Sequence, residues 1–255
     1  MRQEYRLSAR AILYALYKLR CHGMYGLPAV MPDPRSAEFP LFAQKCEEEI
    51  LAAGLSSMNF DGEVTLDQEF STLLRSCAQC HGVAAARLKH KGVLRKVTLY
   101  PNAGAMLLRD EEEQCVLKAA EDVAGELLAL LALPGDVPGC DSLRVNTDHL
   151  EQRDRDGLMA DGCSEELADA LLADLAGAGG YAHIVRTVFR NRTDDLMLLY
   201  GGDHRLMATP EYADGQEWLR LSPVSPEAVE EQVRRLAQAM FTNWDDDDDE
   251  VQEDR

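Results

Sequence analysis

The sequence predicts an α+β protein: an antiparallel sheet built from two pseudo-two-fold related β-β-(β)-α halves, with helices packed on it and a helical unit at the N-terminus. Three observations lead to this prediction. Apolar residues recur at helical spacing through most of the first 90 residues. Two later segments instead alternate apolar and polar residues, which is typical of half-buried strands. Each of these segments is followed by an amphipathic helix.

The N-terminal part, residues 1–90, is predicted to be helical. Three helices are expected there, over residues 7–20, 41–54 and from 65 to about 90. Ser8 lies near the start of the first helix, Gly54 ends the second, and a loop with four prolines separates the two. A short extended or turn segment follows Gly54. Thr65 and Gln68 then form a capping box at the start of the third helix.

Two β–α halves are predicted beyond this part, over residues 93–133 and 164–241. In the first half, two alternating stretches flank a Pro-Asn-Ala-Gly turn, and an apolar helix follows over residues 121–133. In the second half, a helix over residues 164–180 precedes three or four short strands. The last helix starts at Pro226, a residue favoured at the first position of a helix.

The two β regions resemble each other at a constant offset of 91 residues. Residues 93–108 and 184–199 share an arginine, a valine and the run Met-Leu-Leu at matching positions, namely Arg95 with Arg186, Val97 with Val188, and 106–108 with 197–199. Two hairpins can share such residues by chance. If the similarity is an internal duplication, both halves supply strands to one antiparallel sheet.

Residues 1–243 are expected to form a single domain, and residues 244–255 a disordered acidic tail. The tail contains the run Asp-Asp-Asp-Asp-Asp-Glu, and a block of like charges repels itself and stays solvated. Residues 134–163, between the two β–α halves, are punctuated by Gly, Pro and Asp. We expect this connecting segment to contribute little to the core.

The composition restricts the partners and the compartment. The formal net charge of −19 disfavours non-specific contact with nucleic acid or anionic lipid, and it favours basic, polar or apolar partners. No secretion signal is recognisable, and no apolar run approaches the roughly 18 residues of a membrane span. We therefore expect a cytoplasmic protein without membrane insertion, in which the seven cysteines stay reduced.

The sequence Cys77-Ala-Gln-Cys80-His81 has the spacing of a c-type haem attachment motif and of part of a zinc site. Cys77 also continues the apolar stripe of the third predicted helix, together with Phe70 and Leu74. A buried free cysteine commonly acts as a small hydrophobic residue, and no second Cys-x-x-Cys completes a zinc site. We expect the motif to be coincidental, with neither a metal nor a cofactor bound.

Enzyme and DNA-binding functions are weaker alternatives. The chain has no phosphate-binding glycine loop, nucleophile elbow or zinc-protease motif, and Asp203-His204 is expected to lie in a polar turn between strands. The N-terminal helices could belong to a winged-helix regulator, but Glu47–Glu49 would then oppose DNA phosphates. The only basic cluster, residues 86–96, is expected at a helix–strand junction, where it balances acidic neighbours.

The order of these elements resembles the EspG-type proteins of type VII (ESX) secretion systems, in particular their Gram-positive relatives. The features that carry the resemblance are "LPAVMP" and "ILAAGL" in the helical part, "GEVTL" before the third helix, and the two Met-Leu-Leu units. The resemblance spans residues 7–241. It implies a non-enzymatic cytosolic adaptor or chaperone that binds a helical hairpin of a secreted protein. We expect a monomer or weak dimer and assign no binding residues from the resemblance.

Overall fold

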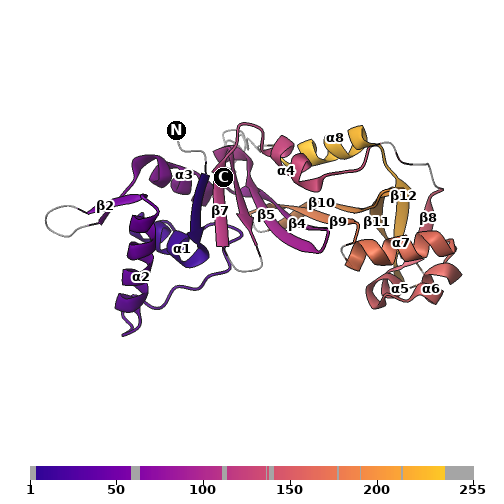
Figure 1. The fold of residues 1–255 in the computed structure, drawn as a ribbon, viewed down its shortest axis with the longest axis horizontal. Helices are drawn as coiled ribbons and strands as arrows, with labels where there is room; N and C mark the ends of the chain where they lie inside the picture. The colour runs from indigo at the N-terminus through magenta and orange to yellow at the C-terminus, as the bar shows by residue number, and fades with distance from the viewer. Residues whose placement is uncertain are drawn as a thin grey trace, which may run out of the picture.

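A ten-stranded antiparallel sheet runs through the molecule, with helices on both of its faces (Figure 1). The computed structural model describes residues 4–58, 64–110, 114–135, 137, 141–176, 178–189, 191–213 and 215–238. The expected acidic tail, residues 244–255, lies outside the described residues. A small second sheet pairs β2 (Ser56–Met58) with β3 (Val64–Leu66), where a short extended segment was predicted.

All neighbouring strands of the large sheet are antiparallel. Their order is β1 (Glu4–Ser8), β7 (Gln114–Ala119), β6 (Ala105–Arg109), β5 (Val93–Tyr100), β4 (Gly82–His90), β9 (Gly180–Val188), β10 (Asn191–Tyr200), β11 (Arg205–Ala213), β12 (Gln216–Pro223) and β8 (Leu143–Asn146). The predicted α+β class with a large antiparallel sheet is therefore confirmed.

The two halves of the chain meet at the centre of this sheet, where β4 pairs with β9. On one side lie β4 to β7, followed in the chain by a helix, and on the other lie β9 to β12, again followed by a helix. Residues 93–108 and 184–199 do contribute to one sheet, as predicted. The offset of 91, however, matches β5 with β9. These two strands are not equivalent, because β9 lies at the junction of the two halves and β5 lies one strand away from it. The pseudo-two-fold relation stays a prediction.

With the exception of α2, the described α-helices begin at side chains that accept hydrogen bonds from their free backbone N–H groups. They are α1 (Ala9–Lys18), α2 (Phe39–Ala52), α3 (Gln68–Ala78), α4 (Val123–Leu131), α5 (Thr147–Gln152), α6 (Arg155–Ala160), α7 (Glu165–Ala176) and α8 (Pro226–Leu236), with a 3₁₀ turn, η1, at Pro101–Ala103. Ser8 caps α1, and Ser164 accepts a hydrogen bond from the Leu167 N–H in α7. The cap of α3 is Asp67, which accepts from the Phe70 N–H at 2.9 Å, and not Thr65 as predicted.

The prediction that residues 1–90 are helical was wrong at both ends. Residues 4–8 form the edge strand β1, and residues 82–90 form β4, one of the two central strands. The alanines of β4 favour a helix locally. Burial nevertheless alternates along the strand, because Ala84 and Ala86 are buried whereas Ala85 is exposed. Pairing with β5 and β9 on both sides therefore overrides the local helix propensity.

The segment 134–163 contributes more to the core than expected. It supplies the edge strand β8 and the short helices α5 and α6. Val145 and Leu158 are completely buried, and Leu150 and Cys163 are nearly so. Each of these short elements contributes only one or two apolar residues to the core. Among frequent Gly, Pro and Asp, so few apolar residues form no periodic pattern that predicts a buried element.

Three hydrophobic cores hold helices against the sheet. One lies beneath α4 and α8, and the other two lie on the opposite face, beneath α1–α3 at one end and beneath α5–α7 at the other (Figure 1). Strand β10 shows the alternation: Leu198 and Tyr200 belong to the core of α4 and α8, whereas Leu199 packs with α7. The buried Tyr200 hydroxyl donates to the Leu131 carbonyl of α4 at 2.8 Å.

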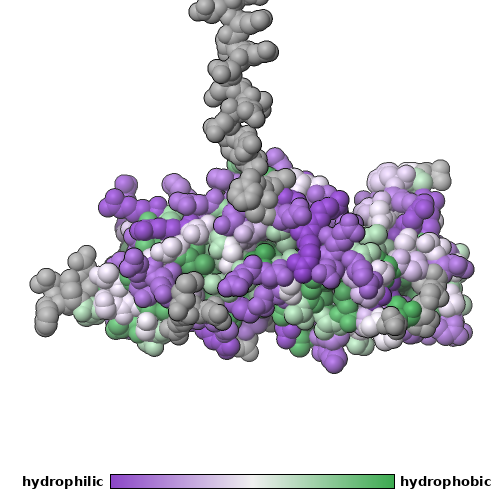
Figure 2. All heavy atoms as spheres, turned by 90° about the horizontal axis from the view of Figure 1, so that it is seen from above, coloured by the Kyte–Doolittle hydropathy of each residue, from purple (hydrophilic) through white to green (hydrophobic). Residues whose placement is uncertain are grey.

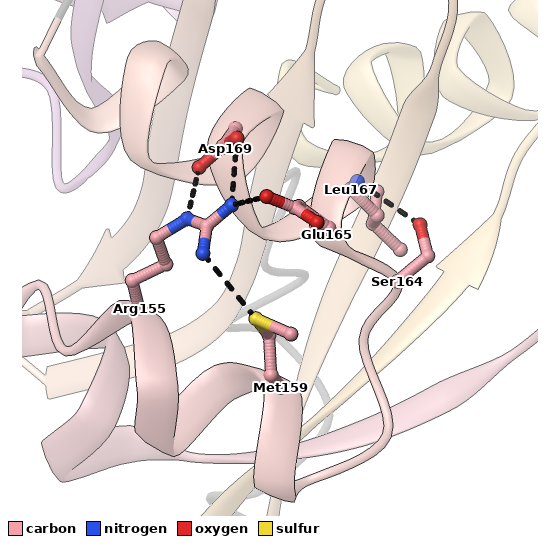
Figure 3. A network of polar contacts seen from close by, with 6 residues as sticks. All are labelled: Arg155, Met159, Ser164, Glu165, Leu167 and Asp169. Carbon is pink, nitrogen blue, oxygen red and sulfur yellow. Dashed lines mark hydrogen bonds and ion pairs between the residues drawn. The ribbon is translucent and has the colours of Figure 1, made fainter.

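An arginine network fixes the position of α6 relative to α7. The Arg155 guanidinium donates to Asp169 Oδ1 at 2.6 Å and to Glu165 Oε1 at 2.5 Å, and it also contacts the Met159 sulfur (Figure 3). Both carboxylates come from the first turns of α7, where negative charge also interacts favourably with the helix dipole. This network braces the helices that cover the second end of the sheet.

Candidate functional site

The middle of the sheet has one uncovered face. Helices α4 and α8 pack on β4, β9 and β10 from one side (Figure 1). On the other side, the helices lie towards the two ends, and no helix of the described residues covers the middle of β4 and β9 and the adjoining part of β5. Ala85, Arg87 and Lys96 are accordingly exposed, although their strands are central ones. An antiparallel sheet can leave one face in contact with solvent, so the side chains on this face decide what it can bind.

The strand register defines which residues share this uncovered face. Arg87 lies directly opposite Lys96 on β5 and opposite His183 on β9. Ala85 lies opposite Val185 on β9. Directly opposed residues of antiparallel strands project from the same face of the sheet. We call this set of five residues, Ala85, Arg87, Lys96, His183 and Val185, the open strip.

The open strip has defined borders on both sides. On one side, the backbone at Gly26 lies against the Thr98 side chain of β5, so the loop before α2 ends the uncovered area there. On the other side, the Lys89 ammonium donates to the Leu175 carbonyl at 3.1 Å and ties β4 to the end of α7. Three strands, β5, β4 and β9, lie between the two borders.

The open strip carries unbalanced positive charge. Within the described parts of the chain, neither Arg87 nor Lys96 has an ion-pair or hydrogen-bond partner for its side chain. His183 lies 3.4 Å from Asp195, a carboxylate that also pairs with Arg192. Among the described residues, the carboxylate beside His183 is thus already engaged, in a chain whose formal charge is −19.

The predicted location of the basic cluster 86–96 was wrong. The cluster forms the β4–β5 hairpin at the centre of the sheet, and not a helix–strand junction. Among the described residues, Lys89 has a structural partner, but this partner is the backbone carbonyl of Leu175 at the end of a helix and not an acidic side chain. Arg87 and Lys96 do not balance acidic neighbours among the described residues. They lie directly opposite each other on the neighbouring strands β4 and β5, where two like charges repel each other and weaken the pairing.

The cysteine motif lies at the end of α3. Cys77 is completely buried in the N-terminal core, and burial raises the pKa of its thiol well above the usual range. Cys80 is also buried, whereas His81 is exposed and stacks on Phe189 with ring centroids 5.0 Å apart. The described residues contain no group of three or more His, Cys, Asp or Glu side chains placed to hold a metal ion. Cys77 thus occupies the core position that its helical spacing indicates.

A buried histidine lies between two carboxylates in the second half of the chain. His204 Nε2 is 2.5 Å from Asp174 Oδ2 of α7, and Nδ1 is 2.7 Å from Asp203 Oδ1. Burial lowers the pKa of His204, but the hydrogen bonds to Asp174 and Asp203 outweigh this and raise it. Burial raises the pKa of Asp174 itself, against the effect of its bond to His204. Both ring nitrogens are occupied, so this cluster fastens α7 to the β10–β11 turn.

A second surface feature is a hollow of about 1360 Å³ beside α3 and α4. Its charged lining is mostly acidic, but two of its carboxylates have partners: Glu126 pairs with Lys118 at 2.5 Å, and Asp122 pairs with Arg234. Figure 2, which views the molecule from the side of α4 and α8, shows hydrophobic surface divided into small areas by hydrophilic side chains. On this side, charged side chains such as Glu126 and Asp122 therefore already have partners, in contrast to Arg87 and Lys96 of the open strip.

Two of the three glutamates in the Glu47–Glu49 run of α2 contact the neighbouring helix and strand, whereas Glu48 is exposed. Glu49 accepts hydrogen bonds from the backbone N–H and the hydroxyl of Ser8, and Glu47 accepts one from the Tyr14 hydroxyl at 2.6 Å. These contacts attach α2 to α1. The two carboxylates thus have a structural partner, which their sequence pattern alone did not indicate.

Comparison with known proteins gives a likeness of fold. No protein-family model matches the chain, and no curated protein matches its sequence. Among solved structures, the fold is similar to that of a secretion chaperone. That structure is the Mycobacterium tuberculosis type VII secretion system chaperone EspG5 in complex with the PE25-PPE41 dimer. The TM-score is 0.60 at 12% sequence identity, and the match covers 94% of this chain and 98% of the other.

At this level of identity the likeness shows the fold alone, and it extends over nearly the whole of both chains. The mixed arrangement of one large antiparallel sheet with helices at both ends is therefore shared with a secretion chaperone. Separately, none of the described helices is long and apolar enough to cross a membrane.

Proposed function

We propose that this chain is a non-enzymatic, cytosolic adaptor or chaperone of a type VII secretion system, and that it binds a helical segment of a secreted protein. The observation that carries the proposal is the fold, which matches a chaperone of such a system over 94% of the chain. The resemblance in element order that the sequence itself presents supports the same function.

The open strip is the surface we assign to the partner. It is an uncovered sheet face in the middle of the molecule, and it combines small apolar side chains, Ala85 and Val185, with polar ones. An amphipathic helix can bury its apolar side on such a surface while polar groups set its orientation. The helices at the two ends hold β5, β4 and β9 in place, so the surface is rigid before a partner binds.

The test is capture of the partner by the full-length chain in the native host. The chain would be tagged and recovered at moderate salt, and co-purified proteins would be identified by mass spectrometry. A matched pair of variants locates the surface: Ala85→Trp fills the open strip, whereas Thr209→Trp adds the same side chain at an exposed position of β11. Tryptophan is well tolerated in strands, so both variants should fold.

We expect the wild type and Thr209→Trp to recover a small helical secreted protein, and Ala85→Trp to lose it. Equal recovery by both variants would remove the open strip as the binding surface. A chain that recovers no such protein, and instead turns over a metabolite or retains a specific DNA fragment, would show that the proposed function is wrong.

A further inference from the structure

The charge of the open strip limits what it can bind. Arg87 and Lys96 face each other on β4 and β5, and their Cβ atoms are about 5 Å apart at such directly opposed positions. Like charges at directly opposed positions destabilise the pairing of two strands, and an anion bound over them would relieve this repulsion. Arg109 on β6 continues the same row beyond Lys96. The row thus presents a line of cations across three neighbouring strands.

Two directly opposed cations on an uncovered sheet face set this arrangement apart. Several arginines elsewhere contact carboxylates, among them Arg155, Arg220 and Arg234. Other basic side chains have no ion pair among the described residues, but Arg87 and Lys96 are unpaired and also lie opposite each other on neighbouring central strands. Local rules of stability are most often broken at functional positions.

We propose that the open strip binds an acidic face of a single partner α-helix, whose glutamate or aspartate side chains pair with Arg87 and Lys96. This inference rests on the proposed function, and it adds the chemical character of the partner segment. The dimensions agree with it, because three strands spaced at about 4.8 Å span roughly the 10 Å diameter of one helix. Ala85 and Val185 would lie against the small apolar side chains of that helix.

The net charge of the whole chain does not prevent such binding. At physiological ionic strength the Debye length is about 8 Å, so distant carboxylates of this chain are largely screened from a helix seated on the strip. The carboxylate beside His183, that of Asp195, is already engaged by His183 and Arg192. The electrostatic potential at a bound helix is therefore dominated by the local cations. These cations should affect both the affinity and the orientation of the helix.

The experiment compares two double charge reversals in the full chain. Arg87→Glu/Lys96→Glu changes the open strip, and Arg95→Glu/Arg35→Glu makes the same change in net charge at exposed positions away from it. Arg95 is the closest control available, since it is the neighbour of Lys96 on β5 and projects from the opposite face. Circular dichroism and thermal unfolding establish that each variant is folded.

Two probes are used at about 0.15 M salt. One is a designed helical hairpin with glutamates at i, i+4 spacing along one helix and alanines beside them, and the other is its glutamine isostere. Binding is measured by fluorescence anisotropy. We expect the wild type and the control variant to bind the glutamate hairpin at least about tenfold more tightly than the glutamine one, and the Arg87→Glu/Lys96→Glu variant to lose this preference.

Three results would overturn the inference: equal binding of the two hairpins, no binding of either, or an unchanged preference in Arg87→Glu/Lys96→Glu. Tighter binding of a single-stranded oligonucleotide of the same charge would also overturn it, since the strip would then be a general polyanion site. The proposed function is tested separately by capture in the native host. If Arg87→Glu/Lys96→Glu still recovers the native partner, the acidic helix is excluded while the chaperone function stands.

Discussion

At the scale of single residues, Cys77 shows how one position can have two interpretations. Its spacing from Cys80 and His81 matches a haem or zinc motif, and its spacing from Leu74 matches a buried helix face. In the structure, Cys77 and Leu74 are both completely buried, and His81 is exposed. Packing therefore accounts for Cys77 without a ligand role.

We expect Cys77→Ser to lower the free energy of unfolding by about 1–3 kcal/mol, because a hydroxyl buried without a hydrogen-bond partner loses its hydration. Urea denaturation of the purified protein measures this difference. Cys21→Ser, at a less buried position, is the control and should change stability much less. The wild type should contain neither zinc nor haem by elemental analysis and absorption spectroscopy. One equivalent of tightly bound metal that disappears in Cys80→Ser or His81→Ala would contradict this interpretation.

At the scale of elements, polar contacts join the helices of the second half to each other and to the sheet. Arg155 holds α6 to α7, and His204 holds α7 to the turn between β10 and β11 (Figure 3 shows the first of these networks). The hydrogen bonds of His204 to two carboxylates require a proton on each ring nitrogen. Its contribution to stability must therefore depend on pH.

The sign of this dependence follows from the raised pKa of His204. A group whose pKa is higher in the folded than in the unfolded state stabilises the fold while it is protonated. This stabilisation is complete below the unfolded pKa, which is 6.5 for histidine. It is lost as the pH rises through the pKa of the folded state. We expect the stability difference between the wild type and His204→Gln to be largest below pH 6.5 and to shrink as the pH rises through the raised pKa of the folded state. Urea denaturation across this range measures it, with His22→Gln as the exposed control. A difference that grows with pH would show that the histidine is neutral in the fold.

At the scale of the whole molecule, the sheet is open at two edges, β1 and β8. Both edge strands are short, with five and four residues, and each carries charged side chains such as Arg6 and Arg144. Short charged edges resist pairing with a second copy. A net charge of −19 adds a general repulsion between copies.

We therefore expect the free protein to be a monomer, or at most a weak dimer, at concentrations of about 10–100 µM, where short charged edges and self-repulsion disfavour pairing. Sedimentation velocity at low and moderate salt measures this. Self-association should increase slightly with salt, because screening weakens the repulsion. A stable dimer at all salt concentrations would contradict the expectation and would indicate that an edge strand or an apolar patch is self-complementary.

The sequence by itself determined the α+β class, because helical and alternating periodicities are local properties of the chain. It also determined most helices and the burial of Cys77, since a helix places every third or fourth residue on one face. Only the tertiary structure decided the role of residues 82–90, whose alanines are helix formers until β5 and β9 pair with them. It alone brought Arg87 opposite Lys96 and left that face uncovered. Such juxtapositions depend on strand register and on which helices reach the centre of the sheet, and neither is encoded in local periodicity.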